Sequence, residues 1–152
     1  WTMAVTDIWF DDPATGFAAE AGGNDTIEGG AGDDVLYGEE TVLGDTTQGL
    51  DDRVVYENAA SGIVADFTTN TVQDGDGGTD TVYEFDEIVG SAHDDMITLS
   101  DHYTNGMDAW GGAGHDSIIG TSGQNTIYGE DGDDSILGST GNEIIKGGNG
   151  SD

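Results

Sequence analysis

A nine-residue repeat between residues 111 and 146 constrains the fold of this chain more than any other feature. Four blocks follow one another without a gap, and each has glycine first and fourth, an oxygen-bearing side chain sixth and isoleucine eighth: GGAGHDSII, GTSGQNTIY, GEDGDDSIL and GSTGNEIIK. A fixed period this short predicts a solenoid, in which each repeat packs on its neighbours, and not a globular core. Within each block a Gly-rich turn of six residues precedes a three-residue strand.

A less regular copy of the pattern lies on the N-terminal side. The blocks EAGGNDTIE and GGAGDDVLY place Asp25 and Asp34 at the sixth position, and later blocks place Asp80 and Asp95 there. We therefore predict a non-repetitive cap or connector over residues 1–19 and a repeat region over 20–152 that contains an insertion at about 38–74. Strand signals inside the insertion lie at 53–57 and 62–67. Since the final block stops in mid-repeat, we expect the repeat region to be truncated at its C-terminus.

The charge balance is strongly one-sided. The 152 residues include 32 Asp plus Glu against 2 Lys plus Arg, a formal net charge of -30. Such a charge opposes compaction and argues against nucleic acid as a partner. A disordered tail or a halophilic surface would explain the charge, but not the apolar residues that recur in phase with the glycines. Bound cations that neutralise the carboxylates explain both facts.

Several other classes of protein are disfavoured by composition and spacing. The chain has no cysteine, which excludes disulfides and thiolate zinc sites, and no apolar run long enough for membrane insertion. EF-hand loops starting at Asp74 or Asp131 lack the required glycine or glutamate. The histidines are dispersed and lie beside aspartates in so acidic a chain by chance, so we expect neither a zinc site nor catalysis: His93, His102 and His115.

Three of the blocks, GGAGDDVLY, GGAGHDSII and GEDGDDSIL, resemble the nonapeptide repeats of RTX, or haemolysin-type calcium-binding, proteins, whose pattern is G-G-x-G-x-D-x-U-x with U a large apolar residue. The resemblance implies an all-β fold, a right-handed parallel β-roll in which two nonapeptides make one coil and Ca²⁺ ions lie between turns on the same side. Several ions are expected, with carbonyl and carboxylate oxygens as ligands. The expected metal-binding residues are Asp25, Asp34, Asp52, Asp80, Asp95, Asp116, Asp134, Asp152, Gly30, Gly32, Gly112, Gly114, Gly132, Asp133 and Asn125.

Counting by coils of 18 residues sorts these positions into columns. Asp116, Asp134 and Asp152 share one column, which Asp95 joins across an irregular half-coil at 99–110 and Asp80 across a shortened corner. On the opposite side the sixth positions hold no aspartate, so we expect little or no calcium there: Met107, Asn125 and Glu143. Asp34 and Asp52, also 18 residues apart, are predicted to form a separate pair.

The eighth position is predicted to point inward and to build a thin aliphatic column: Ile27, Leu36, Val54, Val82, Ile97, Ala109, Ile118, Ile127, Ile136 and Ile145. So thin a core is too small to fold a chain of this charge alone, which predicts folding on calcium binding. The ninth position faces outward, with Trp110 and Tyr128 on one sheet and Ile119 and Leu137 on the other. Those side chains are compatible with ordinary surface packing, with partner contact or with sugar binding.

The resemblance implies a calcium-binding structural module of a secreted or cell-surface bacterial protein that is exported by type I secretion and folds outside the cell. We expect a role in assembly or adhesion, in a surface layer, filament or adhesin. The expected partners are calcium ions, together with further copies of the chain, neighbouring surface proteins or polysaccharide. The alternative is a non-catalytic accessory module of a secreted protease, lipase or polysaccharide-modifying enzyme.

Overall fold

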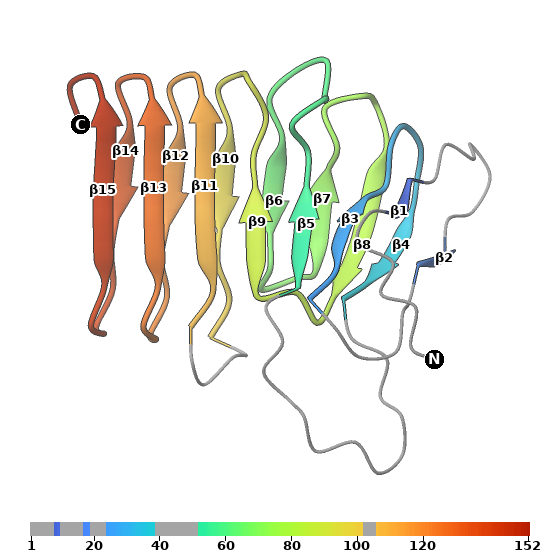
Figure 1. Cartoon of the computed structure of the whole chain (residues 1–152), viewed down its shortest axis with the longest axis horizontal. Coiled ribbons are helices and arrows are strands. Elements are labelled where there is room, and N and C mark those ends of the chain that lie inside the picture. The colour runs from blue at the N-terminus through green and yellow to red at the C-terminus, as the bar shows by residue number, and fades with distance from the viewer. Residues whose placement is uncertain (1–7, 10–16, 19–23, 39–51, 102–105) are drawn as a thin grey trace, which may run out of the picture.

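Two layers of β-strands make up the fold. The computed structural model describes residues 8–9, 17–18, 24–38, 52–101 and 106–152, and in that part of the chain every regular element is a strand (Figure 1). No helix of the length and apolarity needed to cross a membrane occurs in these ranges. The strands form one sheet of seven and one sheet of eight.

Apart from three consecutive strands of the eight-stranded sheet, the chain alternates between the two sheets. The seven-stranded sheet has the order β1 (Ile8–Trp9), β3 (Thr26–Glu28), β5 (Arg53–Val55), β9 (Glu87–Val89), β11 (Asp108–Ala113), β13 (Thr126–Asp131) and β15 (Ile144–Asn149). The eight-stranded sheet has the order β14 (Ser135–Leu137), β12 (Ser117–Ile119), β10 (Met96–Thr98), β6 (Val64–Asp66), β7 (Thr71–Gln73), β8 (Thr79–Tyr83), β4 (Val35–Tyr37) and β2 (Phe17–Ala18). Apart from β7, neighbouring strands are parallel, which agrees with the predicted β-roll.

The register of the strands follows the nonapeptide repeat. Ala109 pairs with Ile127, and Ile127 pairs with Ile145, one coil of 18 residues later. Because side chains alternate across a strand, the middle residue of each three-residue strand points inward and its two neighbours point outward. The repeat thus converts one apolar residue in nine into a continuous column between the sheets.

The predicted inward column is buried except at its C-terminal end. Eight of the ten predicted side chains are fully buried, whereas Ile136 is partly buried and Ile145 is 44% exposed. Both lie in the final described coil, which has no further coil packed on it. Larger side chains outside the repeat blocks widen the core at its N-terminal half: Tyr56, Phe67, Phe85 and Ile88.

Residues 53–66 form part of the roll, although their sequence lacks the Gly-rich turn. Val54 pairs with Ile27 on one side and Ile88 on the other, and Ala65 pairs with Ile97. Both strands keep an inward middle residue, which is sufficient for them to join the sheets without turn glycines. The departure from the solenoid is therefore β7, which runs antiparallel to both β6 and β8. Of the predicted cap, only β1 and β2 lie within the described residues, and they extend the two sheets.

Successive coils lie so close together that a side chain larger than hydrogen does not fit at some of the turn glycines. A methyl group on Gly132 (φ 152°) would overlap the Gly114 carbonyl oxygen of the preceding coil, whereas one on Gly77 (φ 104°) would meet no atom within 4 Å. We expect Gly132→Ala to lower the free energy of unfolding by about 3 kcal/mol or more, and Gly77→Ala by only about 1 kcal/mol of backbone strain. Thermal unfolding of both variants at saturating calcium measures the difference, and equal losses would contradict the stated packing.

Candidate functional site

A ladder of carboxylates runs along one edge of the roll. We call the turns that lead from the seven-stranded to the eight-stranded sheet the upper edge, because they lie at the top of Figure 1. Each carboxylate accepts a hydrogen bond from the backbone N–H of the preceding coil: Ile63 to Asp95 Oδ1 (2.8 Å), Asp95 to Asp116 Oδ1 (2.8 Å), Asp116 to Asp134 Oδ1 (2.9 Å) and Asp134 to Asp152 Oδ1 (3.0 Å). These four aspartates thus occupy one column, in the order that counting by coils predicts.

In the middle of this column, the second oxygen of each carboxylate makes no hydrogen bond. Asp116 Oδ2 and Asp134 Oδ2 are buried and have no hydrogen-bond partner. Such buried polar atoms are rare and costly unless something else satisfies them. Each of these oxygens is therefore available as a ligand for a cation.

A cradle surrounds each of these oxygens. A methyl group on Gly111 would clash with Asp116 Oδ2 and lie 2.8 Å from the Gly129 carbonyl oxygen. One coil later, a methyl group on Gly129 would clash with Asp134 Oδ2 and lie 2.5 Å from the Gly147 carbonyl oxygen. The same arrangement of a first-position glycine, a carboxylate oxygen and a carbonyl oxygen thus repeats from coil to coil.

The stacked carboxylates are electrostatically unfavourable as anions. Burial raises the pKa of Asp116 to about 6. The hydrogen bond from the Asp95 N–H lowers this pKa, whereas the negative charges of Asp95, Asp134 and Asp94 raise it further. Burial also raises the pKa of Asp95. A divalent cation between the turns would supply the missing partner and relieve this repulsion.

The donor set fits calcium. Ca²⁺ takes six to eight oxygen ligands from carboxylates and backbone carbonyls in flexible geometry. Among the described residues, no group of three or more His, Cys, Asp or Glu side chains is placed to hold a metal by itself. An ion in these cradles would therefore take its side-chain oxygens from Asp116 and Asp134, and its remaining oxygens from the backbone of the turns.

At the N-terminal end of the upper edge, Asp80 lies beside Asp34. The Asp34 N–H donates to Asp80 Oδ1 (3.1 Å), and the Tyr56 hydroxyl donates to Asp80 Oδ2 (3.0 Å). Burial raises the pKa of Asp80 to about 7, although these two hydrogen bonds lower it. The negative charges of Asp34 and Asp74 raise it further. Asp80 is separated from Asp95 by β7 and β6 in the sheet order, so it continues the column of Asp34 and does not directly follow Asp95.

The predicted pairing of Asp34 with Asp52 is wrong. The Asp25 N–H donates to Asp52 Oδ1 (2.8 Å), which places Asp52 on the opposite, lower edge with Asp25. The coil from Asp25 to Asp52 contains 27 residues, one nonapeptide more than a regular coil. Because one nonapeptide is half a coil, the additional nine residues move Asp52 across the roll.

Asp86 is a lower-edge position that the sequence analysis missed. The Asp52 N–H approaches Asp86 Oδ2 at 3.5 Å, and the Asp86 N–H donates to the Asp52 carbonyl oxygen (3.0 Å). Asp86 stands two residues before the buried Ile88, the spacing of the sixth and eighth repeat positions. That spacing was the available signal, and it was hidden because the turn before Asp86 lacks glycines.

Further along the lower edge, an asparagine takes the place of aspartate. Asn125 Oδ1 accepts from the Met107 N–H (2.9 Å), as an aspartate would. Its Nδ2, however, donates to the Thr121 carbonyl oxygen (2.7 Å) and to Glu143 Oε2 (3.2 Å). The atom that corresponds to the unpartnered aspartate oxygen is thus a satisfied donor, whereas Glu143 Oε1 on the same edge is buried without a hydrogen-bond partner. Little or no calcium on this side stays a prediction.

The remaining predicted residues shape the turns. The five predicted glycines adopt positive φ angles that other residues rarely tolerate: Gly30, Gly32, Gly112, Gly114 and Gly132. Asp133 is exposed and accepts from the Ser151 N–H (2.9 Å), in a second ladder outside the buried one. The sequence analysis missed the first-position glycines that line the cradles, namely Gly111, Gly129 and Gly147.

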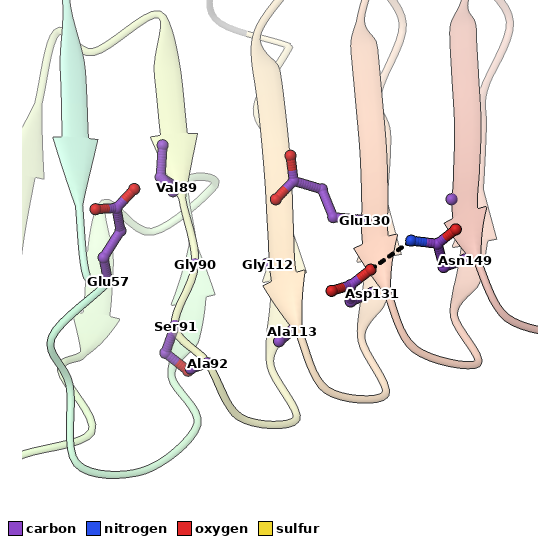
Figure 2. A pocket seen from close by; sticks show the side chains of 11 residues that line it. Glu57, Val89, Gly90, Ser91, Ala92, Gly112, Ala113, Glu130, Asp131 and Asn149 are labelled. Carbon is purple, nitrogen blue, oxygen red and sulfur yellow. Dashed lines mark hydrogen bonds between the residues drawn. The ribbon is translucent and has the colours of Figure 1, made fainter.

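An acidic groove follows the outside of the upper edge. Figure 2 shows Glu57, Glu130 and Asp131 spread along it, with Asn149 Nδ2 donating to Asp131 Oδ1 (2.7 Å). Glu130 and Asp131 end β13, Asn149 ends β15 and Glu57 follows β5, and their side chains do not converge on one point. The groove therefore adds negative potential beside the buried column without forming a further side-chain cluster.

The aromatic pair on the outer face of the seven-stranded sheet is covered on both sides. Trp110 and Tyr128 stack at 5.5 Å between ring centroids, with the Arg53 guanidinium 4.9 Å from the Trp110 centroid and the Lys146 ammonium 4.6 Å from the Tyr128 centroid. Both cations of the chain thus flank one aromatic stack, which we call the cation–aromatic ladder. Sugar stacking requires a free ring face, so this arrangement favours a structural role for the pair.

The comparisons with known proteins give one result. The family model described as RTX calcium-binding nonapeptide repeat (4 copies) matches residues 21–40, 110–142 and 137–152. No curated protein and no solved structure matches the chain.

Exchanging one carboxylate oxygen tests the cradle. Asp116→Asn keeps the acceptor for the Asp95 N–H but replaces an oxygen of the cradle by a donor, so we expect at least one fewer calcium ion per chain. At calcium 10 to 100 times the dissociation constant, the loss corresponds to about 1.4 to 2.7 kcal/mol of stability. Native mass spectrometry and calorimetric titration measure the number of ions.

Two controls accompany that variant. Asp131→Asn removes an exposed carboxylate that the groove holds outside the cradle, and it should leave the number of ions unchanged. Asn125→Asp makes the reverse exchange on the lower edge and should allow an additional ion to bind. Equal calcium content in wild type and Asp116→Asn would contradict the assignment of the cradle.

Calcium and protons should compete for the same carboxylates. The raised pKa values, about 6 for Asp116 and about 7 for Asp80, mean that the metal-free fold gains stability below pH 4 that is lost as the pH rises through 6 to 7. Calcium must displace these protons, so the calcium concentration at the midpoint of binding to the Asp116 cradle should rise by about tenfold between pH 7 and pH 5. Calcium titrations followed by circular dichroism at several pH values test this, and a midpoint independent of pH would contradict it.

Proposed function

Because the chain carries RTX calcium-binding nonapeptide repeats, we propose that it serves as a calcium-stabilised structural module of a secreted or cell-surface bacterial protein. The calcium-binding repeat is the function that the family assigns. The observation that carries the proposal is the repeated cradle, in which a buried, unpartnered carboxylate oxygen lies between a glycine and a carbonyl oxygen of the next coil. The role of that cradle in export and assembly is our proposal.

Calcium would act chiefly on folding. The two layers enclose one thin column of aliphatic side chains, and a net charge of -30 opposes their closure. Each ion that binds only the folded form at 10 to 100 times its dissociation constant adds about 1.4 to 2.7 kcal/mol. A domain whose total stability is about 5 to 15 kcal/mol can therefore depend on a few such ions.

This dependence suits a protein that crosses a membrane before it folds. Where free calcium is scarce, repulsion among the carboxylates keeps the chain unfolded, and where calcium is abundant the coils close. RTX repeats are typical of secreted proteins, which supports an extracellular location. Outside the cell, the closed roll would serve as a rigid, elongated spacer in an assembly or an adhesive structure.

We propose that the module itself is not catalytic. His93 lies exposed in a turn, and His115 Nδ1 accepts a hydrogen bond from the Asp133 N–H (2.9 Å), which engages that ring nitrogen in the turn. His102 lies outside the described residues. The second candidate role, an accessory module attached to a secreted enzyme, would use the same calcium-dependent fold and place the chemistry in another part of the protein.

Folding on calcium addition tests the proposal directly. In chelator at pH 7.5, we expect the far-ultraviolet circular dichroism of an unfolded chain, and at about 10 mM calcium the spectrum of a β protein. Magnesium at the same concentration is the matched control, because it demands a smaller octahedral site and should not restore the fold. A β spectrum of equal intensity in chelator and in calcium would refute the proposed role of calcium.

A further inference from the structure

One coil of the upper edge lacks both of the residues that form a cradle. The first position of each turn lies two residues after the inward residue of the preceding strand, and the other described turns of this edge have glycine there: Gly29, Gly90, Gly111, Gly129 and Gly147. After β5 this position holds Tyr56. Two residues before the inward Ala65 of β6, where the other described coils have aspartate, the chain has Ile63. Both replacements fall in the same turn.

The Tyr56 side chain fills the space that a first-position glycine leaves open. A methyl group on Gly111 or Gly129 would clash with a carboxylate oxygen, so a side chain at this position points into the cradle. Tyr56 is 3% exposed, and its hydroxyl donates to Asp80 Oδ2 (3.0 Å). The same Asp80 oxygen lies 3.2 Å from a methyl group placed on Gly29 in the neighbouring coil. The hydroxyl therefore contacts an oxygen that lines the Gly29 cradle.

The oxygen ligands that this turn could offer are also replaced or already bonded. In the regular coils, the carbonyl oxygens of Gly129 and Gly147 line the cradle of the preceding coil. The Tyr56 carbonyl oxygen instead accepts a hydrogen bond from the Ala59 N–H (3.0 Å) within its own turn. Ile63 is 1% exposed, and its N–H donates to Asp95 Oδ1 as in the regular ladder. The coil thus keeps its link to the next coil but has no carboxylate at the sixth position.

Backbone N–H groups satisfy the carboxylates that surround the Tyr56 hydroxyl. Burial and the negative charges of Asp80, Asp74 and Asp34 raise the pKa of Tyr56 well above its usual value, so the hydroxyl stays a hydrogen donor at neutral pH. Asp80 Oδ1 accepts from the Asp34 N–H (3.1 Å). Asp74 accepts on both oxygens, from the N–H groups of Asp76 (2.8 Å), Gly77 (2.9 Å), Gly78 (2.9 Å) and Gly32 (3.3 Å). Several such donors can stabilise a buried carboxylate as an anion.

We propose that Tyr56 determines which coils of the upper edge bind calcium: its hydroxyl takes the place of an ion at Asp80, and its coil interrupts the column of ions between Asp80 and Asp95. This inference rests on the proposed function, because it presupposes that calcium binds in the regular cradles. It adds a rule for their occupancy, since a coil binds an ion where the first position is glycine and a carboxylate oxygen lacks a partner. Asp80 is then a structural residue, although the repeat pattern predicts it as a ligand.

Apolar burial replaces ion binding in this part of the roll. Tyr56 and Ile63 belong to the same core cluster as Phe67 and Phe85. In the described coils from residue 106 onward, the buried apolar residues are smaller or unbranched: Met107, Ala109, Ile118 and Ile127. The coil that contains Tyr56 is therefore closed by packing and hydrogen bonds, whereas the C-terminal coils depend on ions.

The number of bound ions distinguishes Asp80 from Asp116. Asp80→Asn keeps an acceptor for the Asp34 N–H and places an amide donor beside the Tyr56 hydroxyl, whose oxygen can accept. At saturating calcium this variant should bind as many ions as wild type, whereas Asp116→Asn should bind at least one fewer. Native mass spectrometry counts the ions, and circular dichroism establishes that both variants fold.

Restoring the repeat residues tests the role of Tyr56 itself. Tyr56→Gly combined with Ile63→Asp gives the coil the glycine and the carboxylate of a regular cradle, and the double variant should bind one more ion than wild type. Ile63→Asp alone is the matched control, because Tyr56 still fills the cradle and no ion should be gained. Circular dichroism in about 10 mM calcium shows first whether the double variant folds without the buried ring. If it does not fold, the comparison of Asp80→Asn with Asp116→Asn decides.

The outcomes separate this inference from the proposed function. If wild type binds no calcium, the proposed function fails. If wild type binds calcium but Asp80→Asn loses an ion as Asp116→Asn does, Asp80 is a ligand and the assignment of Tyr56 is overturned. A folded double variant that binds only the wild-type number of ions overturns it as well.

Discussion

The constraint on which this structure depends is the stacking of one buried carboxylate on the next in successive coils. Each sixth-position aspartate uses one oxygen to tie its turn to the preceding coil, so the ladder itself is made by ordinary hydrogen bonds. The second oxygen then points into a space too small for any side chain, beside like charges a coil away. The close stacking of the turns thus leaves a buried carboxylate oxygen that a cation can neutralise.

The two edges of the roll differ in this respect. On the upper edge a carboxylate recurs in successive coils, at Asp95, Asp116, Asp134 and Asp152. On the lower edge Asp25, Asp52 and Asp86 begin a similar column, but Met107 interrupts it and Asn125 replaces the free oxygen with an amide that finds its own acceptors. On the lower edge the Asn125 amide makes its own hydrogen bonds while Glu143 Oε1 beside it is buried without a partner, and on the upper edge the second oxygens of Asp116 and Asp134 have no partner.

The nonapeptide pattern was sufficient to predict the two-layered parallel fold, the column of Asp116, Asp134 and Asp152, and most of the buried core. Its failures share one physical origin. Nine residues make half a coil only where the repeat is regular, so a residue count assigns a position to an edge only if the lengths of the intervening turns are known. The long coil before Asp52 moved that residue across the roll, whereas the three additional residues between Asp95 and Asp116 left both aspartates in one column. The strands β5 and β6 were predicted as strands of an insertion and not of the repeat region, because no Gly-rich repeat turn precedes them, although each has an inward middle residue like the repeat strands.

The outer faces of the two sheets also differ in whether their side chains find partners within the chain. On the seven-stranded sheet, Arg53 and Lys146 flank the aromatic pair, and Arg53 also forms an ion pair with Glu87. These contacts link strands from β5 to β15 without calcium, and they leave neither ring face open. The eight-stranded sheet has no corresponding charged contacts across β10, β12 and β14, and its exposed aliphatic side chains are adjacent to one another. The acidic turns on either side of this apolar strip carry much of the net charge, which opposes its non-specific association.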